Sequence, residues 1–179
     1  GTNITGATAG QGMWKTESSN GAAATTTSTN AANSNFQIVA TGNSSSNGLM
    51  LVGPDGNEGA RFMWKDGLPA AWAARTTGNN IIEVEVDINP GTRGASRNSF
   101  GISIYNAGFT RTLVGFQVNS ATGELSLVAY STPSGNPVGN YIYSLAAAPG
   151  VLLPENTWSR VGISYNRTNG RASINASVI

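Results

Sequence analysis

The stretch 80–90 alternates apolar and acidic side chains more regularly than any other part of the chain. A period of two is the side-chain period of a β-strand, so it predicts a strand with one buried and one solvated face. Asn79-Asn80 before the strand and Asn89-Pro90-Gly91 after it are residue types that favour turns. The apolar face carries Ile82, Val84, Val86 and Ile88, and the acidic face carries Glu83, Glu85 and Asp87.

Short apolar runs continue from residue 36 to the end of the chain, separated by Gly, Asn, Pro and Ser. Three pairs of runs flank turn sequences and predict hairpins: Leu49–Val52 with Ala60–Trp64, Arg111–Asn119 with Glu124–Tyr130, and Thr157–Asn166 with Arg171–Val178. Single strands are expected at Phe36–Ala40, Ala70–Arg75, Ser99–Tyr105 and Val138–Leu145, and no helix is expected. This pattern predicts an all-β protein built as an antiparallel two-sheet sandwich or jelly roll.

The chain of 179 residues has the length of one domain with a sizeable core. Residues 1–35 differ in composition, because they are rich in Ser, Thr and Ala, and Gly21–Asn30 has no aliphatic side chain larger than alanine. We expect an N-terminal arm over residues 1–35 that packs on, or extends from, a β-sandwich domain of residues 36–179. Met13-Trp14 would dock this arm, and the arm could also mediate self-association.

Composition excludes several classes of function. The chain has no His and no Cys, which removes disulfides, thiol catalysis, Ser-His-Asp triads and zinc sites built from these residues. Its ten basic residues are scattered and its net charge is +1, so we expect no nucleic acid among its partners. No run approaches the ~18 apolar residues that a membrane span requires, so we expect none.

Two segments resemble strands of concanavalin A-like and laminin-G-like domains. The stretch 80–90 is similar to a family strand whose polar–apolar alternation ends in a Pro-containing turn. Residues 158–174 resemble the family's late hairpin, with a Trp, an alternating strand, an Asn-Gly turn and a second strand. The resemblance implies a concanavalin A-like jelly roll, a scaffold on which carbohydrate or protein recognition is common.

The acidic face of the strand is the one place where acid–base chemistry can be argued. Jelly-roll glycosidases of the laminarinase type place an E-x-D-x-E run on a cleft strand, and Glu83-x-Glu85-x-Asp87 has that spacing with residue types permuted. By this resemblance Glu83 would be the nucleophile and Asp87 the acid/base, with Glu85 between them. Alternate strand residues lie about 7 Å apart, within the roughly 5–10 Å of paired glycosidase carboxylates. The favoured alternative is a solvated outer sheet face.

Two further groups of residues are candidates for binding. Aromatic rings can stack on sugar faces, and the candidate rings are Trp64, Trp72, Tyr141 and Tyr143, with core packing as the alternative. The Gly-rich turn 53–59 offers oxygen ligands from Asp55, Asn57 and Glu58. Calcium needs six to eight oxygens, so a plain turn is favoured, and we expect no cofactor, with calcium as the alternative.

The leading hypothesis is a non-catalytic carbohydrate-binding or adhesion module of a secreted or surface protein, extracellular and bacterial, whose partner is a carbohydrate or a cell-surface ligand. The first alternative is a glycoside hydrolase or polysaccharide lyase that uses the Glu83, Glu85 and Asp87 face. The second is a structural subunit of a surface layer, filament or virion.

Overall fold

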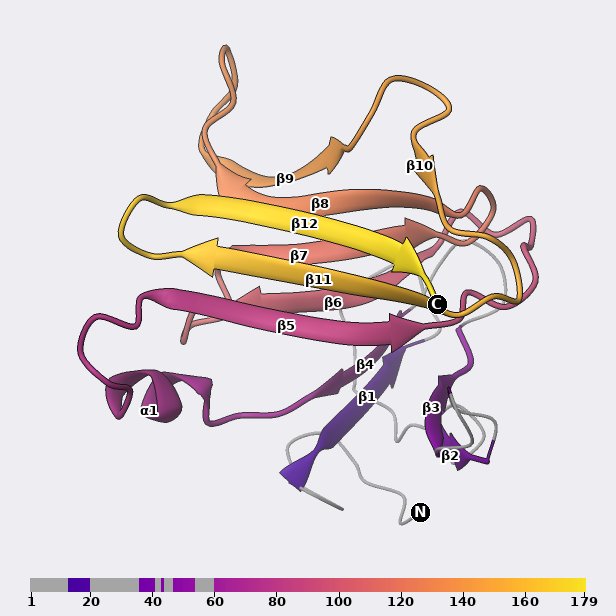
Figure 1. Ribbon diagram of the computed structural model, residues 1–179, viewed down its shortest axis with the longest axis horizontal. Coiled ribbons are helices and arrows are strands. Elements are labelled where there is room, and N and C mark those ends of the chain that lie inside the picture. The colour runs from indigo at the N-terminus through magenta and orange to yellow at the C-terminus, as the bar shows by residue number, and fades with distance from the viewer. Residues whose placement is uncertain (1–12, 20–35, 41–42, 44–46, 54–59) are drawn as a thin grey trace. The chain divides into compact units, whose positions relative to one another are not determined.

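The computed structural model describes residues 13–19, 36–40, 43, 47–53 and 60–179 (Figure 1). Of these residues 51% lie in strands and 6% in helices, and the strands form several antiparallel sheets, none of them closed among the described residues. The all-β prediction is therefore confirmed. The chain divides into two compact units, Gly1–Ala73 and Ala74–Ile179.

The first unit contains two-stranded sheets and a short helix. Strand β1 (Lys15–Ser19) pairs with β4 (Ala60–Trp64), and β2 (Phe36–Val39) pairs with β3 (Gly48–Leu51). The predicted hairpin of Leu49–Val52 with Ala60–Trp64 is wrong, because each of these strands takes a partner from earlier in the chain.

The strand expected at Ala70–Arg75 is also wrong, because residues Leu68–Ala73 form helix α1. Alanine has the highest helix propensity, and this segment contains three alanines. Pro69 lies in the first turn, where a helix tolerates proline because no intrahelical N–H bond is needed there. The N–H of Ala71 donates to the carbonyl of Gly67 at 3.0 Å.

The second unit contains two antiparallel sheets. The three-stranded sheet has the order β12-β11-β5, with β5 at Ile81–Ile88, β11 at Ser159–Asn166 and β12 at Arg171–Val178. The five-stranded sheet has the order β10-β8-β7-β6, with β9 also paired to β8. Its strands are β6 (Ser99–Tyr105), β7 (Thr112–Asn119), β8 (Glu124–Ser131), β9 (Gly139–Ser144) and β10 (Val151–Leu152).

Both sheets of the second unit contribute side chains to one apolar cluster. Val161 and Ile163 of β11 lie in it with Val114 and Phe116 of β7 and with Leu125 of β8. Phe116 is 1% exposed and Val161 is fully buried, and each such side chain stabilises the fold by about 1.5–3 kcal/mol. The apolar face of β5 packs against the same cluster through Ile82, Val84, Val86 and Ile88, which confirms the alternation that predicted it.

Two of the predicted hairpins are confirmed by the register, β7 with β8 and β11 with β12. Each turn ends in a glycine with positive φ, Gly123 at 74° and Gly170 at 71°. The N–H of Gly123 donates to the carbonyl of Asn119 at 2.7 Å, and the N–H of Gly170 to that of Asn166 at 2.8 Å. Glycine adopts this left-handed conformation without a Cβ clash, so these two turns can be recognised from the sequence.

The two compact units meet between Ala73 and Ala74, and the division expected after residue 35 stays a prediction. Of the expected arm, only residues 13–19 are described, and they form β1 with a short preceding turn. The docking of the arm and its self-association therefore stay predictions.

Candidate functional site

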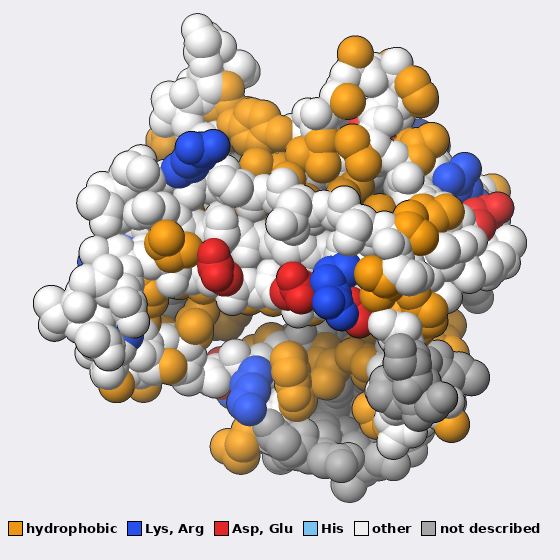
Figure 2. Space-filling model, in the orientation of Figure 1, with side chains coloured by type: hydrophobic (Ala, Val, Ile, Leu, Met, Phe, Trp, Pro, Cys, Tyr) orange, Lys and Arg blue, Asp and Glu red, His pale blue; other side chains and the backbone are white. Residues whose placement is uncertain are grey.

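The outer face of the β5–β11–β12 sheet, turned away from the apolar cluster, carries polar side chains from all three strands. Figure 2 shows acidic and basic side chains side by side on a face that is otherwise largely uncharged. The strand register arranges these residues in three rows: Glu83–Ser164–Ser173, Glu85–Gly162–Asn175 and Asp87–Arg160–Ser177.

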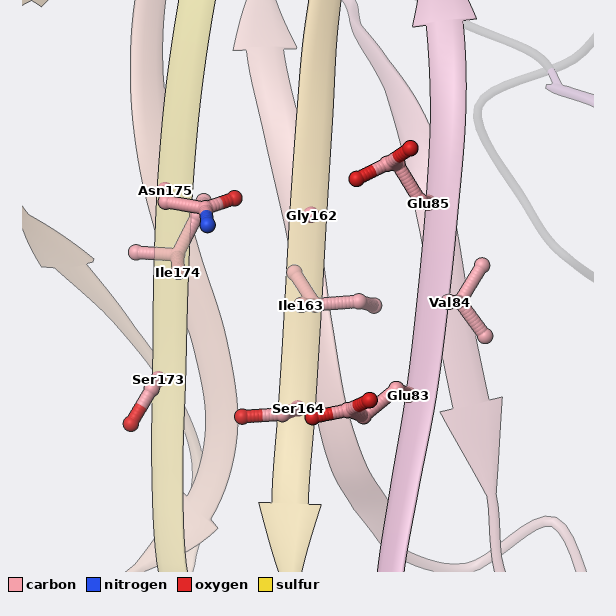
Figure 3. A pocket seen from close by; sticks show the side chains of 9 residues that line it. All are labelled: Glu83, Val84, Glu85, Gly162, Ile163, Ser164, Ser173, Ile174 and Asn175. Atoms are coloured by element: carbon pink, nitrogen blue, oxygen red, sulfur yellow. The ribbon is translucent and has the colours of Figure 1, made fainter.

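Gly162 leaves an open depression in the middle of this face, about 390 Å³ in volume. Figure 3 shows the carboxylates of Glu83 and Glu85 extending from β5 toward β11, and the amide of Asn175 extending from β12 toward Gly162. A Cβ at position 162 would clash with the amide oxygen of Asn175. The absence of a side chain on the central strand therefore creates the depression.

Arg160 holds one end of the acidic row. Its Nε donates to Asp87 Oδ1 at 2.7 Å and its Nη2 to Asp87 Oδ2 at 3.1 Å, and Nε lies 3.5 Å from Glu85 Oε1. The hydrogen bond to Asp87 raises the pKa of Arg160, and the charges of Asp87 and Glu85 raise it further. Arg160 thus stays a cation, and Asp87 is engaged in a bidentate pair.

The other polar groups around the depression have no such partner. Within the described part of the chain, the side chains of Glu83, Ser164, Ser173 and Asn175 make no hydrogen bond. With Arg171 at the far end of β12 included, three carboxylates and two guanidinium groups leave this face with a net charge of −1. The depression therefore offers hydrogen-bond donors and acceptors to a polar ligand that is neutral or cationic.

Of the predicted aromatic residues, the two in the second unit, Tyr141 and Tyr143, do not line this depression. Trp64 on β4 and Trp72 on α1 are half-buried and belong to the first unit. Tyr141 and Tyr143 lie on β9 of the second unit, also half-buried. The hydroxyl of Tyr141 donates to the carbonyl of Pro137 at 2.5 Å, and that of Tyr143 hydrogen-bonds the hydroxyl of Ser131. Both tyrosine hydroxyls thus have partners within their own sheet and the loop before β9.

The calcium candidates Asp55, Asn57 and Glu58 lie outside the described residues, so a site there stays a prediction. Elsewhere, in the part of the chain that is described, no three Asp or Glu side chains gather closely enough to hold a metal ion. Among those same residues, no helix has both the length and the apolar character needed to cross a bilayer.

Sequence reasoning placed Glu83 and Glu85 on the correct face but missed Gly162, Ser164 and Asn175. The sequence contained the information needed to find these three residues, because the predicted β11–β12 hairpin determines which residues share a sheet face. It also missed the loop between β6 and β7, where Phe109 is 60% exposed with φ of 54°. A phenylalanine in the left-handed region has no sequence signature, because glycine or asparagine usually fills such positions.

Comparison with protein-family models, with curated proteins and with solved structures finds no match to this chain. The resemblance to concanavalin A-like and laminin-G-like domains therefore stays a prediction.

Proposed function

We propose that the chain is a non-catalytic carbohydrate-binding module, secreted or exposed on a cell surface, and that the depression over Gly162 binds the sugar. The scaffold we propose for it is a concanavalin A-like two-sheet sandwich. The observation that carries the proposal is the gap at Gly162, around which Glu83, Glu85 and Asn175 present polar atoms.

Sugar hydroxyls donate and accept hydrogen bonds, and the depression offers groups for both. The carboxylates of Glu83 and Glu85 accept, the amide of Asn175 does both, and the hydroxyls of Ser164 and Ser173 do both. Bonds to the carboxylates are charge-assisted and therefore stronger than bonds between neutral groups. Paired strands hold these side chains, and rigid elements position a binding site more accurately than loops do.

The charge of the site favours a neutral glycan. Glu83 has no cation beside it among the described residues, and Arg160 is already engaged by Asp87. Arg171 is on this face but does not line the depression, so a uronate or sulfate ester bound there would meet the like charge of Glu83 and Glu85. A neutral polysaccharide or oligosaccharide suffers no such repulsion.

The same contacts favour binding over hydrolysis. A glycosidase needs one carboxylic acid that remains protonated, which requires an environment that disfavours its charge. The Glu85 side chain is 62% exposed and its Oε1 lies 3.5 Å from Nε of Arg160, so this carboxylate is in solvent beside a cation and not in an apolar pocket. Asp87 is held by two hydrogen bonds from the same cation. Glycan recognition without cleavage therefore accounts better for this arrangement.

A glycan array probed with the native protein and with Gly162→Ala tests the proposal. The added methyl group occupies the centre of the depression and displaces the amide of Asn175, which can move aside, so folding is retained. We expect binding to neutral glycans, weakened at least about tenfold in Gly162→Ala, the equivalent of 1.4 kcal/mol. Ser177→Ala, on the same face but outside the depression, is the matched control.

Two results would contradict the proposal: no neutral glycan bound by the native protein, or equal binding by Gly162→Ala. Trp64→Ala and Trp72→Ala test the aromatic alternative in the first unit. Loss of binding in these variants alone would move the site away from Gly162.

A further inference from the structure

The loop between β6 and β7 holds an exposed phenylalanine in a fixed and strained position. The Oδ1 atom of Asn106 accepts hydrogen bonds from the N–H groups of Thr110 at 2.9 Å and Arg111 at 3.0 Å. The N–H of Phe109 donates to the carbonyl of Asn106 at 3.0 Å. These bonds hold Phe109 at φ of 54°, a conformation that a residue with a Cβ disfavours, while its side chain stays 60% exposed.

A second aromatic ring lies beside the first. The ring centroids of Tyr105 and Phe109 are 5.8 Å apart and their planes are inclined by 34°. Tyr105 is 41% exposed, so both rings offer surface to solvent. Strain retained to expose an aromatic ring is a feature of binding sites, because neither the strain nor the exposure stabilises the fold.

The loop also carries a cation, Arg111, which contacts a third aromatic ring. The Arg111 guanidinium carbon lies 4.9 Å from the centroid of the Tyr130 ring, which orients the side chain by a cation–π contact. No carboxylate pairs with Arg111 among the residues that the structure describes. Because β6, β7 and β8 are neighbours, Tyr105 and Tyr130 are separated by two strand spacings, roughly 10 Å, and Arg111 precedes the strand between them.

We propose that Tyr105, Phe109, Arg111 and Tyr130, here called the loop platform, bind a uronic acid residue of an acidic polysaccharide. The apolar face of the sugar ring stacks on Phe109 or Tyr105, and its carboxylate pairs with Arg111. Charge complementarity selects this occupant, because an unpaired guanidinium beside aromatic rings matches a ring that bears a carboxylate. The charge preference is opposite to that of the Gly162 depression, so the platform is a separate site that extends the proposed glycan recognition.

Isothermal titration with an oligogalacturonate tests the loop platform. The matched ligand is the same oligosaccharide with its carboxylates reduced to alcohols, and polyglutamate controls for charge alone. We expect the native protein to bind the oligogalacturonate at least about tenfold more tightly than either control ligand, the difference expected for one charge-assisted hydrogen bond.

Two variants separate stacking from charge. Phe109→Gly removes the ring at a backbone position that suits glycine, so the fold is retained, and we expect at least about a tenfold loss of affinity. Arg111→Gln should abolish the preference for the acidic over the reduced ligand. Val138→Ser, at a residue that is 55% exposed in the loop before β9, should leave the affinity unchanged.

The inference is overturned if the native protein does not bind the oligogalacturonate, if polyglutamate binds equally well, or if both platform variants retain native affinity. Gly162→Ala should bind the oligogalacturonate as the native protein does. Failure of the Gly162 proposal on neutral glycans is thereby distinguished from failure of the loop platform.

Discussion

The guanidinium of Arg160 donates two hydrogen bonds to the carboxylate of Asp87, with Nε–Oδ1 at 2.7 Å and Nη2–Oδ2 at 3.1 Å. This pair joins β11 to β5 across a separation of 73 residues. Asp87 and Glu83 therefore differ, because Asp87 connects two strands while the Glu83 side chain makes no hydrogen bond among the described residues. This difference between Asp87 and Glu83 cannot be recognised from the regular spacing of the acidic residues in the sequence.

A double-mutant cycle with Arg160→Gln and Asp87→Asn should show a stabilising coupling between the two side chains. The hydrogen bond to Asp87 raises the pKa of Arg160, so on the alkaline side the coupling persists up to the ordinary arginine pKa and is lost as pH rises through the raised one. Both side chains contact solvent, so the coupling should decrease at about 1 M salt, where the screening length is ~3 Å.

Urea denaturation of the four proteins, at low and at high salt, measures this coupling. Glu83→Gln is the control, since no cation pairs with Glu83 among the described residues, and its effect should depend less on salt. A coupling of zero at low salt would show that the pair does not stabilise the β5–β11 contact.

Gly101→Ala and Gly162→Ala should differ in stability, although both glycines lie in strands. A Cβ at position 101 would overlap the backbone carbonyl of Phe116, which the sheet holds in place, so we expect a loss of about 3 kcal/mol. At position 162 the obstacle is the flexible end of Asn175, so the change should stay within about 1 kcal/mol. Urea denaturation midpoints check both values, and equal losses would contradict this reading of the two sites.

Ser159→Ala should stabilise the protein by about 1 kcal/mol, because it removes a buried polar atom that has no partner. Ser159 is 0% exposed, and its Oγ has no hydrogen-bond partner within the part of the chain that the structure describes. Thermal and chemical unfolding measure the change. Ser164→Ala, on the other face of the same strand, should change stability by less than about 0.5 kcal/mol. A marked loss in Ser159→Ala would mean that its hydroxyl is satisfied in solution.

Asn106→Ala should lower the free energy of unfolding by about 1–2 kcal/mol, since it removes the acceptor for two backbone N–H groups of the loop. Phe109→Gly should stay within about 1 kcal/mol of the native value, because relief of the left-handed strain offsets the entropy that glycine gains in the unfolded chain. Chemical denaturation measures the free energy of unfolding of both variants. A larger loss in Phe109→Gly than in Asn106→Ala would show that the ring supports the fold.

The parts of the fold that the sequence predicted correctly are those with a local physical cause. Alternation identified β5, and the Asn-to-Gly turns at Gly123 and Gly170 identified two hairpins. The pairing of β1 with β4 was missed, because it joins segments far apart in the chain and no turn between them marks it. The helix at Leu68–Ala73 was missed because a run of alanines around one tryptophan has neither the length nor the period of an amphipathic helix.

The candidate site was predictable only in part, for the same reason. The sequence indicates that Glu83 and Glu85 share a face. Asn175 joins this face at the depression only because β12 pairs with β11, and because Gly162 of β11 lies between Glu85 and Asn175. The loop platform depends on a backbone conformation that Phe109 adopts against its own preference. Such positions are set by the surrounding hydrogen bonds and cannot be identified from residue type.

Among the described strands, β5 pairs only with β11, which the ribosome produces much later. During synthesis its apolar face, including Val84 and Val86, is therefore exposed until β11 has been made. Exposed alternating strands of this kind self-associate readily, and flanking charge opposes this. We therefore expect that neutralising the carboxylates of Glu83, Glu85 and Asp87 lowers the soluble yield on expression even if the folded protein remains stable.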